Sequence, residues 1–277
     1  MIAGIIHPGS GLGNQLARYV MTRIVAMDKD LDFGMINPQA FKGHFLGLDM
    51  GKNVPVEFDV IGGGEVVPKN HTFNRYIEKK VIENGIDIRG YDFKGVADIQ
   101  DNTIIDGEFQ GEEYYKHHRN EINDWLKVRH TPIVNRNTCV LCFRGGEYLG
   151  TPELFLPQIY WQRAMNYMKQ LNPSIDFIVA TDDYPTARQF FPDLAIIDDI
   201  ITRHDMAEDW KATRYAPYLI LSNASFYILP AWLNTKATII APKHWARHNI
   251  AIWALEQNKY KGWYYQDRDG NLEKYEK

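Results

Sequence analysis

The chain has 277 residues, of which 45% are hydrophobic, with 31 basic and 35 acidic residues and a net charge of -4 at pH 7. This length and apolar content suit one large domain or two ordinary ones, and the mixed charge argues against nucleic acid as a partner. No apolar stretch has the length of a signal sequence or a membrane span, so we expect a soluble, cytoplasmic protein without an integral membrane segment.

The first predicted elements are a strand, a glycine-rich turn and a helix. The apolar run from Ile2 to Ile6 predicts a strand, and it leads directly into "HPGSGLGNQLARY", which has three glycines in five residues. After the turn, apolar residues recur at helical spacing as far as Met27, which predicts one buried helix face. We expect Asn14 to cap this helix.

The region of residues 41–84 is the least regular part of the sequence. It has scattered prolines and the glycine cluster "VIGGGE", and no order of elements is predicted for it. Alternation resumes with "NTIID" as a strand and "EEYYKHHRNEINDWLKV" as a helix. Because the following "HTPIVNRN" has a proline and little periodicity, we expect a domain boundary there, between residues 1–130 and 131–277.

The second half alternates between strands and helices. The predicted strands are "NTCVLCF", "IDFIVATDD", "LAIID" and "KATIIAP", and the predicted helices are "YWQRAMNYMKQL" and "TARQFF". This alternation is typical of α/β domains built on parallel sheets.

Cys139 and Cys142 lie three residues apart in one predicted strand, where a disulfide cannot easily form, so we expect buried thiols. His244 and His248 lack the third ligand of a metal site, so we expect no metal.

The glycine-rich turn does not fit the common phosphate-binding motifs. A dinucleotide fingerprint starting at Gly9 would need glycine at position 14, which is Asn, and the G-K-[ST] of a P-loop is missing. One interpretation is a turn that only reverses the chain. The other is a ligand-binding turn, because Asn14 and Gln15 place side-chain amides at a helix N-terminus, which favours an anion or a sugar.

Five segments in chain order resemble the alpha-1,2-fucosyltransferase family (glycosyltransferase family 11), over about three quarters of the chain. "GSGLGNQLARYV" resembles the family's G-G-L-G-N-Q-M-F-Q-Y-A, and "DGEFQGEEYYKHHRNEI" resembles its G-Y-F-Q-S-E-K-Y-F. The resemblance implies an inverting enzyme that uses GDP-fucose, with two Rossmann-like α/β domains facing each other across a cleft in a GT-B-like fold.

The third segment, "VLCFRGGEYLGTPE", is similar to the family's V-H-I-R-R-G-D-Y. The resemblance implies that Arg144 meets the donor's diphosphate, where a guanidinium offers two charged donors to the leaving group. The family's His is Cys142 here, its second Arg is Gly145 and its Asp is Glu147.

The fourth and fifth segments supply further expected contacts with the nucleotide. "DFIVATDD" resembles F-x-I-F-S-D-D, and its register favours Asp182 over Asp183, although capping of the next helix is an equal alternative for either aspartate. "LILSNASFYILPAWLN" resembles I-I-A-N-S-T-F-S-W-W-G-A-W-L-N, which implies that Asn223, Ser225 and Phe226 contact the nucleotide.

The sequence therefore predicts a glycosyltransferase with an acceptor-leaning domain over residues 1–130 and a donor-binding domain over residues 131–277. The catalytic candidates are Arg144 and two possible general bases, Glu147 and Glu153. The expected donor contacts are Gly11, Gly13, Asn14, Arg144, Asp182, Asn223, Ser225 and Phe226. No cofactor or metal is expected. The expected substrates are a GDP-sugar donor and a glycan acceptor.

Two alternatives remain. The departures at Cys142 and Gly145 favour a catalytically silent protein that binds a nucleotide-sugar or a glycan on the same scaffold. A Rossmann dehydrogenase ranks third, because Asn14 breaks the dinucleotide fingerprint.

Overall fold

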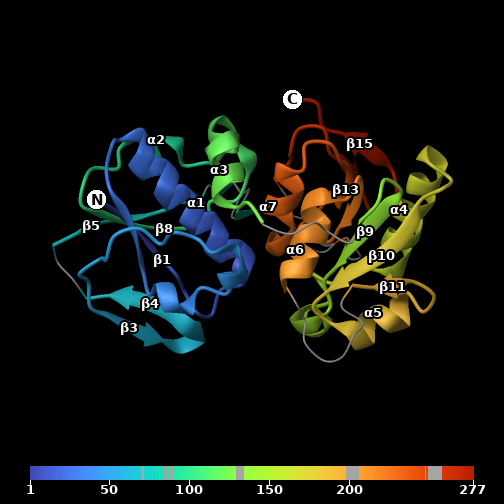
Figure 1. Ribbon diagram of the computed structural model, residues 1–277, viewed down its shortest axis with the longest axis horizontal. Coiled ribbons are helices and arrows are strands. Elements are labelled where there is room, and N and C mark those ends of the chain that lie inside the picture. The colour runs from blue at the N-terminus through green and yellow to red at the C-terminus, as the bar shows by residue number, and fades with distance from the viewer. Residues whose placement is uncertain are drawn as a thin grey trace. The chain divides into compact units, whose positions relative to one another are not determined.

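The computed structural model describes residues 1–69, 72–80, 82–83, 86–87, 90–128, 134–197, 206–246, 248 and 258–277. The chain divides into two compact units, Met1–Val128 and Arg129–Lys277, shown in Figure 1. The predicted boundary at residue 130 lies outside the described residues. Each unit has a largely parallel sheet with helices packed on it, which confirms the predicted α/β class.

The sheet of the first unit has four parallel strands. Their order across the sheet is β2 (Phe33–Ile36), β1 (Ile2–Ile5), β8 (Thr103–Asp106) and β5 (Asn74–Ile77). Helix α1 (Leu12–Asp28) follows β1 and buries the predicted apolar face, except for Met27, which is 42% exposed near the end of the helix. The predicted strand, turn and helix at the N-terminus are therefore confirmed.

Short elements make up residues 38–97 apart from β5, including residues 41–84, for which no order of elements was predicted. Strands β3 (Phe58–Ile61) and β4 (Glu65–Pro68) form one antiparallel pair, and β6 (Ile82–Glu83) and β7 (Ile86–Asp87) form another. The helical segments are η1 (Pro38–Ala40), η2 (His44–Leu46), η3 (Gly62–Gly64) and α2 (Phe93–Ala97).

The prediction of one long helix after β8 is wrong. The chain instead forms η4 (Glu112–Tyr114), η5 (Lys116–His118) and the short α3 (Arg119–Trp125). Tyr114 packs against the rings of Tyr91, Phe93 and Phe109, and its hydroxyl donates to Glu78 at 2.6 Å. The non-helical backbone of Tyr115 (φ -135°, ψ 2°) follows, so these tertiary contacts override the local helix propensity.

The sheet of the second unit has seven strands. Their order is β11 (Ala195–Ile196), β10 (Asp176–Thr181), β9 (Thr138–Phe143), β12 (Tyr218–Leu221), β13 (Thr238–Pro242), β14 (Tyr264–Gln266) and β15 (Leu272–Lys274). The first six are parallel and β15 is antiparallel. All four strands predicted for this half of the chain are present.

Helices cover both faces of this sheet. In Figure 1, α4 (Gln158–Leu171) and α5 (Tyr184–Phe190) lie on one side, and α6 (Met206–Tyr215) and α7 (Ser225–Leu233) lie on the other. Alternate side chains of β9 point to opposite faces of the sheet. Cys139 belongs to the core under α4, whereas the Cys142 thiol lies 3.5 Å from the Thr213 hydroxyl of α6. Both thiols are free and buried, as predicted, and burial raises the pKa of each.

The strand order of the second unit reverses beside its first strand. From β9 the chain runs outward through β10 and β11, then returns to the other side of β9 with β12 and β13. In open α/β sheets, ligands bind at the carboxyl ends of the strands where the order reverses. The ends of β9 and β12 are therefore where the sheet itself favours a ligand.

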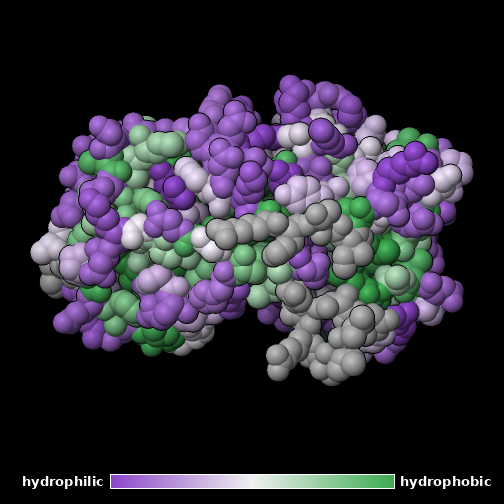
Figure 2. All heavy atoms as spheres, in the orientation of Figure 1, coloured by the Kyte–Doolittle hydropathy of each residue, from purple (hydrophilic) through white to green (hydrophobic). Residues whose placement is uncertain are grey.

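The surface is mixed. On the face seen in Figure 2, hydrophilic residues are interspersed with smaller apolar patches. Within the described ranges, no helix has the length and apolar character needed to cross a membrane.

Candidate functional site

Arg144 directly follows β9 in the second unit and is held by two carboxylates. Its Nη1 lies 2.5 Å from Oδ2 of Asp182, and its Nη2 donates to Oε1 of Glu147 at 2.8 Å. The guanidinium carbon also lies 5.3 Å from the ring centre of Tyr148. The structure thus brings together three residues that the sequence assigned to the site.

The guanidinium of Arg144 stays positively charged. Burial alone would lower the pKa of its guanidinium, but the charges of Asp182 and Glu147 outweigh that cost and raise the pKa above its usual value. The side chain is still 28% exposed. It therefore offers a permanent positive charge that a ligand can reach.

The two glycines after Arg144 bind carboxylates through their backbone. The Gly145 N–H donates to Oδ1 of Asp182 at 3.0 Å, and the Gly146 N–H donates to Oδ2 of Asp183 at 3.0 Å. A Cβ on Gly145 would lie 2.6 Å from the Cβ of Asp183, which is closer than real contacts allow. The second arginine of the related motif thus has no room at position 145 unless the loop moves.

The neighbouring aspartates have different roles. Asp182 contacts Arg144 and Gly145, as described above. Asp183 caps helix α5, because it accepts from the Thr186 N–H at 3.2 Å and from the Thr186 hydroxyl at 2.7 Å. The helix-capping alternative therefore applies to Asp183, while the contact of Asp182 with a nucleotide stays a prediction.

Asn223 follows β12 and joins two loops. Its side chain is buried, and Nδ2 donates to the carbonyl of Leu154 at 3.0 Å and to the carbonyl of Trp245. Within the described part of the chain, Oδ1 has no hydrogen-bond partner. The amide nitrogen thus holds the two loops together, and a contact of Asn223 with the nucleotide stays a prediction.

Ser225 and Phe226 begin helix α7. Ala224 precedes the helix, and among the described residues it makes no side-chain hydrogen bond to the first turn. Such a helix start favours an anion. The half-buried ring of Phe226 packs against Trp210 and Tyr227, with ring centres 6.1 and 5.0 Å away.

The two candidate bases are in different environments. The side chain of Glu147 is 75% exposed and is paired with Arg144. Glu153 is half-buried and precedes Leu154, whose carbonyl accepts from Asn223. The structure therefore places Glu147 at the guanidinium and Glu153 beside the loop that Asn223 holds.

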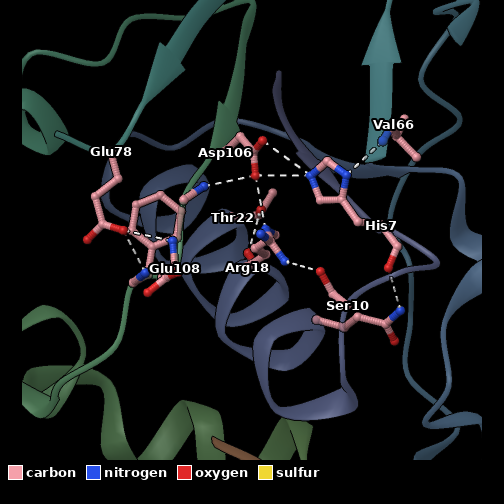
Figure 3. A network of polar contacts seen from close by, with 11 residues as sticks. His7, Ser10, Arg18, Thr22, Val66, Glu78, Asp106 and Glu108 are labelled. Carbon is pink, nitrogen blue, oxygen red and sulfur yellow. Dashed lines mark hydrogen bonds and ion pairs between the residues drawn. The ribbon is translucent and has the colours of Figure 1, made fainter. Parts of the chain in front are cut away.

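A second polar cluster lies at the carboxyl ends of β1 and β8 in the first unit, shown in Figure 3. His7 Nδ1 accepts from the Val66 N–H at 2.8 Å, so its proton is on Nε2, which lies 3.2 Å from both carboxylate oxygens of Asp106. Arg18 donates to Asp106 at 2.9 Å and to Ser10 at 3.1 Å. This cluster was not predicted from the sequence, although His7 and Asp106 each stand at the end of a predicted strand.

Asp106 should stabilise the first unit in a pH-dependent way. Burial alone would raise the pKa of its carboxyl, but His7 and Arg18 hold it below the usual value. The stabilisation is therefore present above the unfolded pKa of about 3.9 and is lost as the pH falls through the lower folded pKa. We expect Asp106→Asn to lower the free energy of unfolding by about 1–2 kcal/mol at pH 7.

Urea unfolding at pH 7 and pH 3 tests this expectation. The difference between wild type and Asp106→Asn should shrink at pH 3, whereas Asp59→Asn, which removes a charge from an exposed pair with Lys69, should have little effect at either pH. A difference that is equal at both pH values would contradict the role of the ionised carboxylate.

The glycine-rich turn is fixed by Gln15. The fully buried side chain of Gln15 donates to the carbonyls of His7 and Ala40 and accepts from the Lys42 N–H. The predicted cap by Asn14 is wrong, because α1 begins at Leu12 after Gly11, and the Asn14 oxygen accepts from Gln110 at 3.1 Å instead.

The three glycines of the turn have different surroundings. A Cβ on Gly9 would lie 1.7 Å from the carbonyl oxygen of Gly63, so this position requires glycine for the close approach of two loops. Gly11 has a φ of -65° and open space around the Cβ position. Gly13 is buried in the first turn of α1. The donor contacts predicted for Gly11, Gly13 and Asn14 are untested and stay predictions.

His244 and His248 lie with their ring centres 6.2 Å apart. Burial, together with the neighbouring His244 and Arg268, lowers the pKa of His248 to about 4. Among the residues that the structure describes, no three His, Cys, Asp or Glu side chains are grouped so that they could hold a metal ion.

Comparison with known proteins adds one weak sequence relationship. No protein-family model matches the chain. The chain is 24% identical over 168 residues to the O-antigen biosynthesis glycosyltransferase WbnK of Escherichia coli, a match that covers 54% of each chain. It therefore spans about half the length of this curated relative. Among solved structures, the E. coli heptosyltransferase WaaC with ADP aligns over 88% of each chain, with 9% identity and a TM-score of 0.42.

Proposed function

We propose that the protein is an inverting glycosyltransferase that transfers fucose from GDP-fucose to a hydroxyl of a glycan acceptor, on a GT-B-like scaffold. The observation that carries this proposal is Arg144, which is permanently charged, partly exposed and next to the strand ends where the sheet favours a ligand. The name of the relative WbnK, a glycosyltransferase, supports the same class of reaction. The specificity for GDP-fucose rests on the motif resemblance alone.

In this proposal, residues 131–277 bind the donor and residues 1–130 mainly bind the acceptor. Arg144 and the N-terminus of α7 stabilise the negative charge that develops on the leaving diphosphate. The acceptor hydroxyl attacks the anomeric carbon from the opposite side, and its proton passes to a base or to water. Ser225 contributes its hydroxyl and its backbone N–H at the start of the helix. Phe226 places its aromatic ring near the guanine base of the nucleotide.

A second candidate function is a silent protein that binds a nucleotide-sugar or a glycan. It is favoured by the loop after β9, where a second arginine has no room and the N–H groups of Gly145 and Gly146 already bind aspartates. Such a protein would bind donor nucleotide without transferring its sugar.

Calorimetry with GDP and with NAD tests the ligand class. We expect GDP to bind the full chain in the presence of EDTA, because Arg144 and the helix start supply the charge that a metal would otherwise provide, and we expect NAD not to bind. Tight binding of NAD with no response to GDP would overturn the proposal in favour of a dehydrogenase.

A further inference from the structure

We propose that Asp182 and Glu147 have opposite effects on ligand binding at Arg144. Asp182 is the fixed partner that positions the guanidinium, and Glu147 is a displaceable partner that occupies the place of the donor's diphosphate. The inference rests on the proposed function, since it takes a diphosphate as the ligand of Arg144. It gives Glu147 a different role from the general base predicted from the sequence.

The contacts of Asp182 make it the fixed partner. One of its oxygens lies 2.5 Å from Nη1 of Arg144, and the other accepts from the Gly145 N–H at 3.0 Å. One carboxylate thus holds both the side chain and the backbone of the loop. Only 17% of the Asp182 side chain is exposed, so few water molecules compete for these bonds.

The contacts of Glu147 make it displaceable. It binds the other terminal nitrogen, Nη2, through a single oxygen at 2.8 Å, and its side chain is 75% exposed. It belongs to the short η6 (Gly146–Gly150), which begins at a glycine with a φ of +44°. An exposed ion pair of this kind contributes little free energy, so an incoming anion can replace it at small cost.

The chemistry of the two anions is interchangeable at a guanidinium. Carboxylate and phosphate oxygens both accept charge-assisted hydrogen bonds from its N–H groups. When a diphosphate takes Nη2, Asp182 still holds Nη1 and keeps the guanidinium in place. The Glu147 carboxylate must then turn into solvent. This movement is small, because most of the side chain is already exposed.

Two variants that each remove one negative charge beside Arg144 separate positioning from simple repulsion. In calorimetry with GDP and EDTA, Glu147→Gln should bind GDP roughly two- to fivefold more tightly, because no ion pair has to be broken. Asp182→Asn should bind GDP roughly threefold more weakly, or worse, because Arg144 loses its fixed partner. Charge repulsion alone would tighten binding in both variants, and that result would overturn the proposal.

Three controls complete the experiment. Glu276→Gln removes a charge from the exposed pair with Lys274 and should leave GDP binding unchanged. Guanosine, which lacks the diphosphate, should bind wild type and Glu147→Gln equally. In an Arg144→Ala background, Glu147→Gln should give no gain, since the pair no longer exists.

The outcomes distinguish failure of this inference from failure of the proposed function. If wild type and Arg144→Ala bind GDP equally well, or neither binds it, the diphosphate is not the ligand of Arg144 and the proposed function fails. If Arg144→Ala weakens binding while Glu147→Gln leaves it unchanged or weakens it, only the exchange of partners is overturned. Melting temperatures of all variants establish that each is folded.

Discussion

Replacing Arg144 with alanine is expected to lower the rate of donor turnover by about 100-fold or more. The guanidinium keeps its positive charge at the end of β9, and in the proposed mechanism its bond to the leaving diphosphate strengthens as negative charge develops in the transition state. Removing one such donor from an enzyme costs on the order of 10² to 10³ in rate. Release of GDP from GDP-fucose, with and without a glycan acceptor, measures the loss.

Arg144→Lys is the matched variant. Lysine keeps the positive charge but cannot hold Asp182 on one nitrogen while it binds a ligand on another, so turnover should stay well below wild type. The melting temperature of both variants should change little, because the side chain is partly exposed. Wild-type turnover in Arg144→Ala would remove this residue from the mechanism.

Gly9→Ala is expected to destabilise the first unit by about 2–3 kcal/mol. The added Cβ would lie 1.7 Å from the Gly63 carbonyl oxygen and 2.8 Å from its carbon, so backbone rather than a flexible side chain must move. The shift would also strain the hydrogen bond from the Gly9 N–H to the Gly64 carbonyl, which measures 3.2 Å. Urea unfolding followed by circular dichroism should show the loss.

Gly11→Ser provides the control within the same turn. Nothing lies within 4 Å of the Cβ position at Gly11, and serine is a favoured residue before a helix, so stability should be unchanged or slightly higher. If Gly11 contacts the donor, as the sequence predicts, Gly11→Ser should nevertheless weaken GDP-fucose use. Equal destabilisation by both substitutions would contradict the different surroundings of the two glycines.

The fold of the second unit was largely predictable, because its strands are continuous apolar runs and its helices are periodic. Arg144 and Asp182 were assigned instead from the motif resemblance, and in the structure they directly follow strands β9 and β10. Periodicity and strand ends are local signals, and they are strong wherever a parallel sheet buries both faces.

The features that were missed depend on contacts between distant segments. His7 and Asp106 are 99 residues apart, and their pairing needs β1 and β8 to be neighbours in the sheet. The loop contacts of Asn223 also follow from tertiary structure alone. The broken helix after Gly111 was missed for the same reason, since the aromatic cluster around Tyr114 outweighs the helical pattern.

The sequence also left open which aspartate caps α5. Two adjacent aspartates after a strand are equivalent in the sequence, and either can accept from the first turn of the next helix. In the structure Asp183 accepts from Thr186, while Asp182 accepts from the Gly145 N–H. The choice thus depends on backbone geometry that a residue pattern does not encode.

Product analysis after incubation with GDP-fucose, EDTA and a set of glycan acceptors tests the central claim most directly. We expect GDP release together with a fucosylated glycan whose anomeric configuration is inverted relative to the donor, and a loss of both products by about 100-fold or more with Arg144→Ala. Binding of GDP without transfer or hydrolysis of any GDP-sugar would contradict it and would identify a silent binding protein.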